Sequence, residues 1–325
     1  MQKYLGFYLI VLAWSPVMAA EAMPHPGVAT RIVVTAKSYY RNPPALTAGD
    51  VIVTDGYRPL PITALVPLRD AQADLEIYLL IDNSSNWDMG QRFIELRDFL
   101  ASQPPTTSIG VAYIQDGRLK VAQRPTHDRE GVLQALTPPC RSTPSNPFRP
   151  LAELIEGWHP DSSRHVVLMI SNGIDPGASG VTNESVDTAL GFAERAGVMV
   201  YSIYHPAAEY LTAGFMTLYA GQIQLAHLAT ESGGAAYFQG LAPLPSFAPF
   251  LADLADHLAN QYLLEFEANA ETHGALHDVA VTSKLRDVHL TAPWRAWIAA
   301  RPALGSDSPI KRAVIAGQKT RRQTL

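Results

Sequence analysis

The chain has 325 residues, of which 47% are hydrophobic and 17% are charged. This is an ordinary globular composition, and the length suits one large domain or two smaller ones. The net charge of −5 and the sequence pI of about 6.0 lack the basic footprint of a nucleic-acid-binding protein. We therefore expect no nucleic-acid partner.

Residues 1–20 predict a secretory signal peptide. Lys3 supplies the positive start, Leu5 to Trp14 is almost wholly apolar, and small residues around Ala19 offer a cleavage site. The apolar run is short for a membrane span, although an uncleaved anchor is the alternative interpretation. We expect a secreted or periplasmic protein without a membrane span in the mature chain. Its single cysteine, Cys140, cannot form an intramolecular disulfide.

Residues 28–66 predict a small N-terminal β segment. Residues 30–36 and 50–54 are rich in β-branched side chains, and Asp55-Gly56 is typical of a tight turn between two strands. Residues 67–74 then form a short connector.

A continuous apolar run at residues 75–81 predicts a strand that is buried on both faces of a parallel sheet. A helical pattern follows over residues 89–102, and two more apolar strands are expected at 165–170 and 198–204. Strands that alternate with helices predict an α/β fold with a doubly wound, mostly parallel sheet. Residues 205–221 show no clear periodicity and are expected to form an insertion loop or lid.

The C-terminal part returns to β structure. Residues 262–301 contain three expected strands, and we predict that they pack with residues 28–66 as a flanking β module, because each segment alone has too few strands to be stable. Residues 302–325 are basic and poor in aromatics, which predicts a disordered tail.

The loop after the first buried strand carries a resemblance to a known family. Residues 82–86 read Asp-Asn-Ser-Ser-Asn and resemble the Asp-x-Ser-x-Ser signature of von Willebrand factor A-like domains. Residues 46–56 resemble the hairpin that precedes this domain in bacterial exported "VWFA-related" proteins, and residues 261–264 resemble a landmark after its last helix. The resemblance covers about residues 28–300 and implies a Rossmann-like A domain over residues 74–261.

The resemblance also implies a divalent-cation site, built by three loops at the carboxyl edge of the sheet. In the first loop Asp82 and Ser84 match the family, whereas Asn86 replaces a serine. In the third loop Asn172 replaces an aspartate, so an oxygen is kept and a charge is lost. The second loop has no clean match: Asn146 aligns best with the family's threonine, and Thr143 and Ser145 are alternatives.

Of two carboxylates that the family would supply, only Asp82 remains. Carboxylates offset the dehydration of hard cations such as Mg²⁺, and losing one charge removes about a few kcal/mol of attraction. We therefore predict a degenerate site that binds Mg²⁺ weakly or not at all, with no certain cofactor. Asp88 and Asp175 lie in the same loops and could partly compensate.

The resemblance implies an exported, non-enzymatic module that binds a protein partner through these loops. Trp87, Asp88, Thr143 and Asp175 are the candidate partner-binding residues. The alternative is a structural or assembly factor whose A domain is a metal-free scaffold. A hydrolase is a third class, against which the sequence offers no nucleophile elbow, paired carboxylates or zinc-ligand spacing. The oligomeric state stays open.

Overall fold

The computed structural model describes residues 27–38, 43–69, 74–84, 90–140, 142–143, 145–158, 164–177, 184–206, 214–269 and 273–300. The predicted signal peptide and the predicted tail at residues 302–325 lie outside these ranges.

The largest sheet in the described residues has six strands in the order β10-β9-β8-β5-β6-β7. All neighbouring pairs are parallel except β6 and β7, which form an antiparallel hairpin at one edge. The strands are β5 (Leu75–Asp82), β6 (Thr107–Gln115), β7 (Arg118–Thr126), β8 (Arg164–Ser171), β9 (Val198–Tyr204) and β10 (Ala236–Tyr237).

Strand β5 lies in the middle of the sheet, between β8 and β6, and almost every residue in it is therefore buried. Ile77, Leu79 and Ile81 point into the core on one face of the sheet, and Tyr78 and Leu80 point into the core on the other. This alternation is the period of two that a pleated strand imposes. A strand whose odd-numbered and even-numbered residues are both apolar therefore needs a layer of helices on each face of the sheet.

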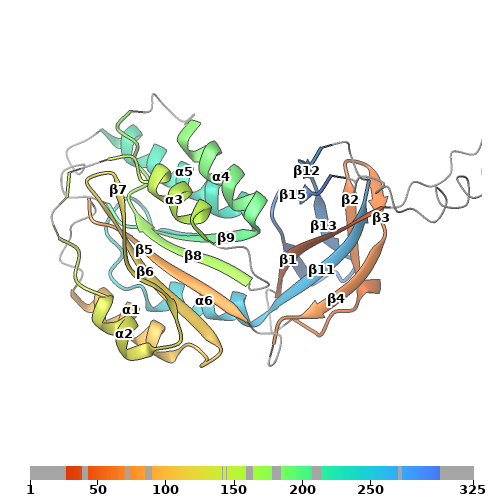
Figure 1. Cartoon of the computed structure of the whole chain (residues 1–325), viewed down its shortest axis with the longest axis horizontal. Helices are drawn as coiled ribbons and strands as arrows, with labels where there is room; N and C mark the ends of the chain where they lie inside the picture. Colours follow the sequence, from red (N-terminus) through yellow and green to blue (C-terminus); the bar gives the residue numbers. More distant parts are fainter. Residues whose placement is uncertain are drawn as a thin grey trace, which may run out of the picture.

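Three helices cover each face of the sheet (Figure 1). The first layer holds α1 (Gly90–Ser102), α2 (Arg129–Ala135) and α6 (Ala248–Ala259), and the second holds α3 (Phe148–Glu156), α4 (Glu184–Ala196) and α5 (Phe215–Glu231). The predicted doubly wound α/β fold class is confirmed.

A separate β module packs beside this α/β body (Figure 1). Its sheets have the strand orders β14-β1-β11-β4, β13-β2-β3 and β12-β15. The elements are β1 (Val28–Ser38), the 3₁₀ turn η1 (Ala48–Asp50), β2 (Val51–Asp55), β3 (Arg58–Leu60), β4 (Ile62–Pro67), β11 (Gln261–Ala268), β12 (Ala275–Asp278), β13 (Ala280–Ser283), β14 (Val288–Thr291) and β15 (Arg295–Ile298). Strand β1 runs antiparallel to both β11 and β14, so the N-terminal and C-terminal β segments share one sheet, as expected for a flanking β module.

The prediction of a loop over residues 205–221 is wrong for its second half, because α5 already begins at Phe215. The buried positions of α5 include Gly221, Gln222 and Gln224 as well as leucines. Because these three residues are not apolar side chains, the buried face of α5 does not appear in the sequence as a regular apolar stripe. Residues 207–213 lie outside the described part of the chain.

Candidate functional site

Asp82 is the last residue of β5 and lies almost completely buried at the carboxyl edge of the sheet. Its Oδ1 accepts hydrogen bonds from the backbone N–H of Ser84 (2.9 Å) and from the Ser84 hydroxyl (2.7 Å). Its Oδ2 accepts a hydrogen bond from the Ser171 hydroxyl (2.7 Å). Because β5 and β8 are neighbouring parallel strands, they bring residues 82 and 171 together across 89 positions of sequence.

Asn172 joins this polar cluster through its nitrogen. The Asn172 Nδ2 donates to the Ser84 hydroxyl at 3.2 Å, whereas its Oδ1 accepts from the backbone N–H of Ile174 at 2.8 Å. Gly173 holds the loop in place with a φ of 68°, and a Cβ there would lie 2.3 Å from the backbone oxygen of Gly221 on α5. The third loop is therefore fixed by backbone packing that only glycine permits.

In the second loop, the side-chain oxygen of Asn146 also binds a backbone N–H group and makes no contact with Asp82. Its Oδ1 accepts from the backbone N–H of Phe148 (2.8 Å) at the start of α3. Its Nδ2 donates to Asp175 Oδ2 (2.6 Å) and to the Ser185 hydroxyl (2.7 Å). The structure thus brings Asn146 and Asp175 together, and it links the second loop to the third.

Thr143 belongs to a different contact. Its backbone N–H and its hydroxyl both donate to Asp116 Oδ1 in the β6–β7 turn (2.9 and 2.7 Å). These hydrogen bonds lower the pKa of Asp116 to about 2. Thr143 therefore fastens its loop to the hairpin.

Three predicted site residues, Asn86, Trp87 and Asp88, lie outside the described residues.

The donor set does not fit a divalent cation in this arrangement. Mg²⁺ requires about six oxygen ligands that converge on one point. Here both oxygens of Asp82 are hydrogen-bonded to serines, and the amide oxygens of Asn146 and Asn172 bind backbone N–H groups. Among the described residues, no three His, Cys, Asp or Glu side chains converge closely enough to hold a metal ion.

Burial dominates the electrostatics of Asp82. It raises the pKa of this carboxyl group, and the hydrogen bonds from Ser84 and Ser171 oppose the rise. Nearby, burial lowers the pKa of His205, at the end of β9, to about 3, and the charge of Arg92 adds to the effect. Burial thus disfavours the charged forms of Asp82 and His205.

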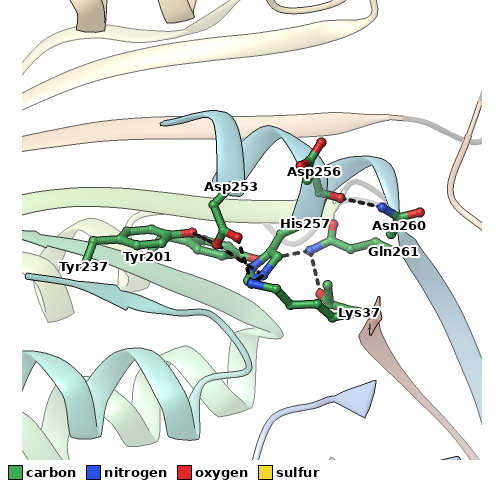
Figure 2. A network of polar contacts seen from close by, with 9 residues as sticks. Lys37, Tyr201, Tyr237, Asp253, Asp256, His257, Asn260 and Gln261 are labelled. Carbon is green, nitrogen blue, oxygen red and sulfur yellow. Dashed lines mark hydrogen bonds and ion pairs between the residues drawn. The ribbon is translucent and has the colours of Figure 1, made fainter. Parts of the chain in front are cut away.

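A second polar cluster, not predicted from the sequence, joins the α/β body to the β module (Figure 2). Lys37 of β1 donates through its Nζ to Asp253 Oδ1 (2.7 Å) and to His257 Nε2 (3.2 Å), both on α6. The Tyr237 hydroxyl of β10 donates to Asp253 Oδ2 (3.0 Å). Since an ammonium group can only donate, the contact with Lys37 requires an unprotonated Nε2 on His257.

Gln261 continues this cluster into the centre of the junction (Figure 2). It is completely buried, and its Nε2 donates to the hydroxyl groups of Thr35 and Tyr201, both at 3.3 Å. Its Oε1 accepts from the buried guanidinium of Arg164 at 2.6 Å. Burial lowers the pKa of Arg164 to about 10. The sequence marks residues 261–264 only as a landmark, and Lys37 lies 216 positions from Asp253, so no local pattern could reveal the cluster.

None of the helices in the described part of the chain is both long enough and apolar enough to cross a membrane.

No protein-family model matches the chain. No curated protein matches it either.

Several solved structures are similar in arrangement. Proximal thread matrix protein 1 from the mussel byssus shares 14% identity over 58% of this chain (TM-score 0.40), and the chain spans about half (46%) of that protein. The vWF domain of the type V pili tip protein Mfa5 from Porphyromonas gingivalis shares 9% identity over 56% of this chain and 93% of that domain (TM-score 0.41). The pilus adhesin SpaC from Lactobacillus rhamnosus GG shares 10% identity over 85% of this chain and 49% of the adhesin (TM-score 0.40).

The six-stranded sheet of this chain, with helices on both faces and the antiparallel edge strand β7, is the arrangement that the sequence resemblance implies.

Proposed function

We propose that the protein is an exported, non-enzymatic binding module that recognises a protein partner through the loops at the carboxyl edge of the sheet, with a divalent-cation site that is degenerate and weak or absent. The partner-binding loops are those around Asp82, Asn146 and Asp175, together with the residues that follow Asp82. The signal peptide at residues 1–20 directs export.

The observation that carries the proposal is an exposed apolar surface at this same edge. Phe215, Met216 and Tyr219, at the start of α5, are 64%, 72% and 47% exposed, and the rings of Phe215 and Tyr219 stack with centroids 5.8 Å apart. Exposed aromatic and methionine side chains are typical of protein interfaces. The close contact between Gly221 and the loop at Gly173 ties α5 to the polar cluster.

The hydrogen bonds of Asp82 support the second part of the proposal. A cation would have to displace Ser84 and Ser171 from a buried carboxyl group and to reverse two asparagine amides. One carboxylate supplies little of the charge that offsets the dehydration of Mg²⁺. Partner binding at this edge is therefore independent of metal.

Thermal unfolding of the full chain in EDTA, Mg²⁺, Ca²⁺ and Mn²⁺ tests the cation site. A cation that binds only the folded state at about 100-fold excess over its Kd adds about 2.7 kcal/mol of stability. We expect the same midpoint in all four conditions. A rise with Mg²⁺ or Mn²⁺ that disappears in Asp82→Ala would show a working site.

Site-specific photo-crosslinking tests the binding surface. A photoreactive residue at Met216, introduced in the native host, should give a discrete protein adduct, and EDTA should not change its yield. The matched control is the same residue at Val121, which is exposed on β7 away from α5. Equal labelling at both positions, or none at Met216, contradicts the proposal.

A broad activity screen on the purified chain tests the claim that the protein is not an enzyme.

The alternative function is a structural or assembly factor in which the A domain is a metal-free scaffold. The junction in Figure 2 favours this alternative, because the contacts from Lys37 to Asp253 and from Gln261 to Tyr201 hold the β module against the α/β body. If a photoreactive residue placed in the β module gives an adduct and one at Met216 gives none, the scaffold function is the correct one.

A further inference from the structure

A cavity of about 230 Å³ lies between the α/β body and the β module, at the amino edge of the sheet. Its walls come from the end of α4, the start of β9, and strands β1 and β15. Its volume is that of roughly eight water molecules at about 30 Å³ each, which leaves room for a small organic molecule. Clefts at domain junctions are common sites for such ligands.

Three arginines line this cavity, and two of them already have carboxylate partners. Arg31 forms an ion pair with Glu265 (2.7 Å). Arg295 forms a two-point contact with Glu194, through Nε to Oε1 (3.0 Å) and through Nη2 to Oε2 (2.5 Å). These pairs cancel the charge of both guanidinium groups.

Arg195 is the third arginine, and it has no carboxylate partner among the described residues. Its guanidinium lies over the ring of Trp297, 5.7 Å from the centroid. It is exposed, as is 40% of Trp297, so both side chains are accessible at the mouth of the cavity. The stacking leaves the edge of the guanidinium, with its N–H donors, available to an anion.

Apart from Ser232, the remaining wall is apolar. Ile32 and Val33 of β1, together with Ala193 and Met199, line it. The cavity therefore offers one uncompensated positive charge beside an apolar surface. A single charge matches a carboxylate, whereas a phosphate monoester carries nearly two negative charges at neutral pH and would leave one uncompensated.

We propose that this cavity binds a small monocarboxylate with an apolar or aromatic body, whose carboxylate accepts hydrogen bonds from Arg195 and whose body packs beside Trp297 against the apolar wall. The site is separate from the loops at the opposite edge of the sheet, and it does not depend on the function proposed for them.

The test is an NMR titration of the full chain with benzoate, which follows the indole Nε1–H signal of Trp297; a Trp297→Phe variant assigns that signal. Benzoate should give a saturable shift with a millimolar Kd. Benzyl alcohol and benzylammonium have the same ring without the negative charge and should bind at least about tenfold more weakly. Phenyl phosphate should also bind more weakly than benzoate.

The matched variants are Arg195→Gln and Arg149→Gln. Arg149 is likewise an exposed helix arginine, but it pairs with Glu153 on α3. Arg195→Gln should raise the Kd for benzoate about fivefold or more, and Arg149→Gln should leave it unchanged. Arg195→Lys, which keeps the charge but loses the planar fork, should have an intermediate effect.

The proposal is overturned if benzoate gives no saturable shift, if Arg195→Gln binds it as the unaltered chain does, or if benzyl alcohol binds equally well. Tighter binding of phenyl phosphate than of benzoate would overturn the choice of a monocarboxylate. Since Arg195 is exposed, its substitutions should leave the thermal midpoint unchanged, which separates lost binding from lost folding.

Discussion

The two edges of the six-stranded sheet use polar residues in opposite ways. At the carboxyl edge, Asp82, Ser84 and Ser171 form a small cluster that is buried and contains a single carboxyl group. At the amino edge, Lys37, Asp253 and Arg164 bring formal charges into the junction with the β module. The first edge is held by short serine and backbone contacts, and the second by long side chains from distant segments.

This difference shows which kind of site a sequence can reveal. A loop cluster is built from residues that follow strands directly, so its members can be recognised at fixed positions after apolar runs. A domain junction is built from residues that have no fixed relation in the sequence. Four predictions test this difference, beginning with the variant that should destabilise the protein most.

The largest effect is expected from Gly221→Ala at the carboxyl edge. The new Cβ would lie 2.3 Å from the backbone oxygen of Asn172 and 2.9 Å from Ile174, so backbone must move. We expect a loss of at least about 3 kcal/mol in the free energy of unfolding, measured by urea denaturation. The control is Gly191→Ala in α4, where a Cβ meets nothing within 4 Å. It should gain about 0.5–1 kcal/mol from helix propensity, and an equal loss in both variants would contradict the packing argument.

At the amino edge, Gln261→Leu should cost about 3 kcal/mol, because it removes the acceptor for the buried guanidinium of Arg164 and the donor to the buried hydroxyl oxygens of Tyr201 and Thr35. Gln261→Glu keeps the acceptor for Arg164 and should recover part of this loss. Gln134→Leu is the control, since this exposed side chain donates to Glu130 within its own helix. If denaturation midpoints of the two leucine variants agree, the junction cluster does not hold the two parts together.

The junction should also make stability depend on pH through His257. Burial lowers the pKa of His257; the charge of Asp253 opposes this and the charge of Lys37 adds to it. Because the folded protein binds this proton less readily than the unfolded chain, the stabilisation is complete above pH 6.5. It is lost as the pH falls from 6.5 toward the folded pKa, by at most about 1.4 kcal/mol per pH unit.

The variant that tests this is His257→Gln, which should flatten the loss of stability below pH 6.5 in denaturation curves. Lys37→Met should act in the same direction, because removing the facing cation lets the pKa of His257 rise. His205, with its pKa near 3, keeps a second proton-linked loss in both variants. An unchanged slope in His257→Gln would show that His257 is not the group responsible.

The smallest effect is expected from Asp82→Asn. The pKa of Asp82 is raised in the folded protein, so the folded state holds this proton more tightly than the unfolded chain, and stability falls as the pH rises from about 4 through the folded pKa. The neutral amide removes this loss, and at pH 7 the variant should be as stable as the unaltered chain or up to about 1 kcal/mol more stable.

Asp116→Asn is its matched control with the opposite sign. The carboxylate of Asp116 accepts hydrogen bonds from Thr143, and these lower its pKa, so the charged form is the stabilised one. Asp116→Asn should therefore lower the thermal midpoint at pH 7. A destabilised Asp82→Asn would indicate that the buried carboxyl group is needed in its charged form.

The α/β fold could be predicted from the sequence, because apolar runs such as residues 75–81 can be buried only inside a sheet with helices on both faces. The sequence also placed Asp82, Ser84 and Asn172 at one edge, since each follows a buried strand. Which atoms these residues present depends on packing between distant segments, and no sequence pattern records it. Backbone N–H groups donate hydrogen bonds to the amide oxygens of Asn146 and Asn172, and Thr143 donates to Asp116. The junction, where Lys37 meets Asp253 and Arg195 meets Trp297, depends on packing in the same way, because pairs of residues more than 100 positions apart have no spacing that a pattern could record.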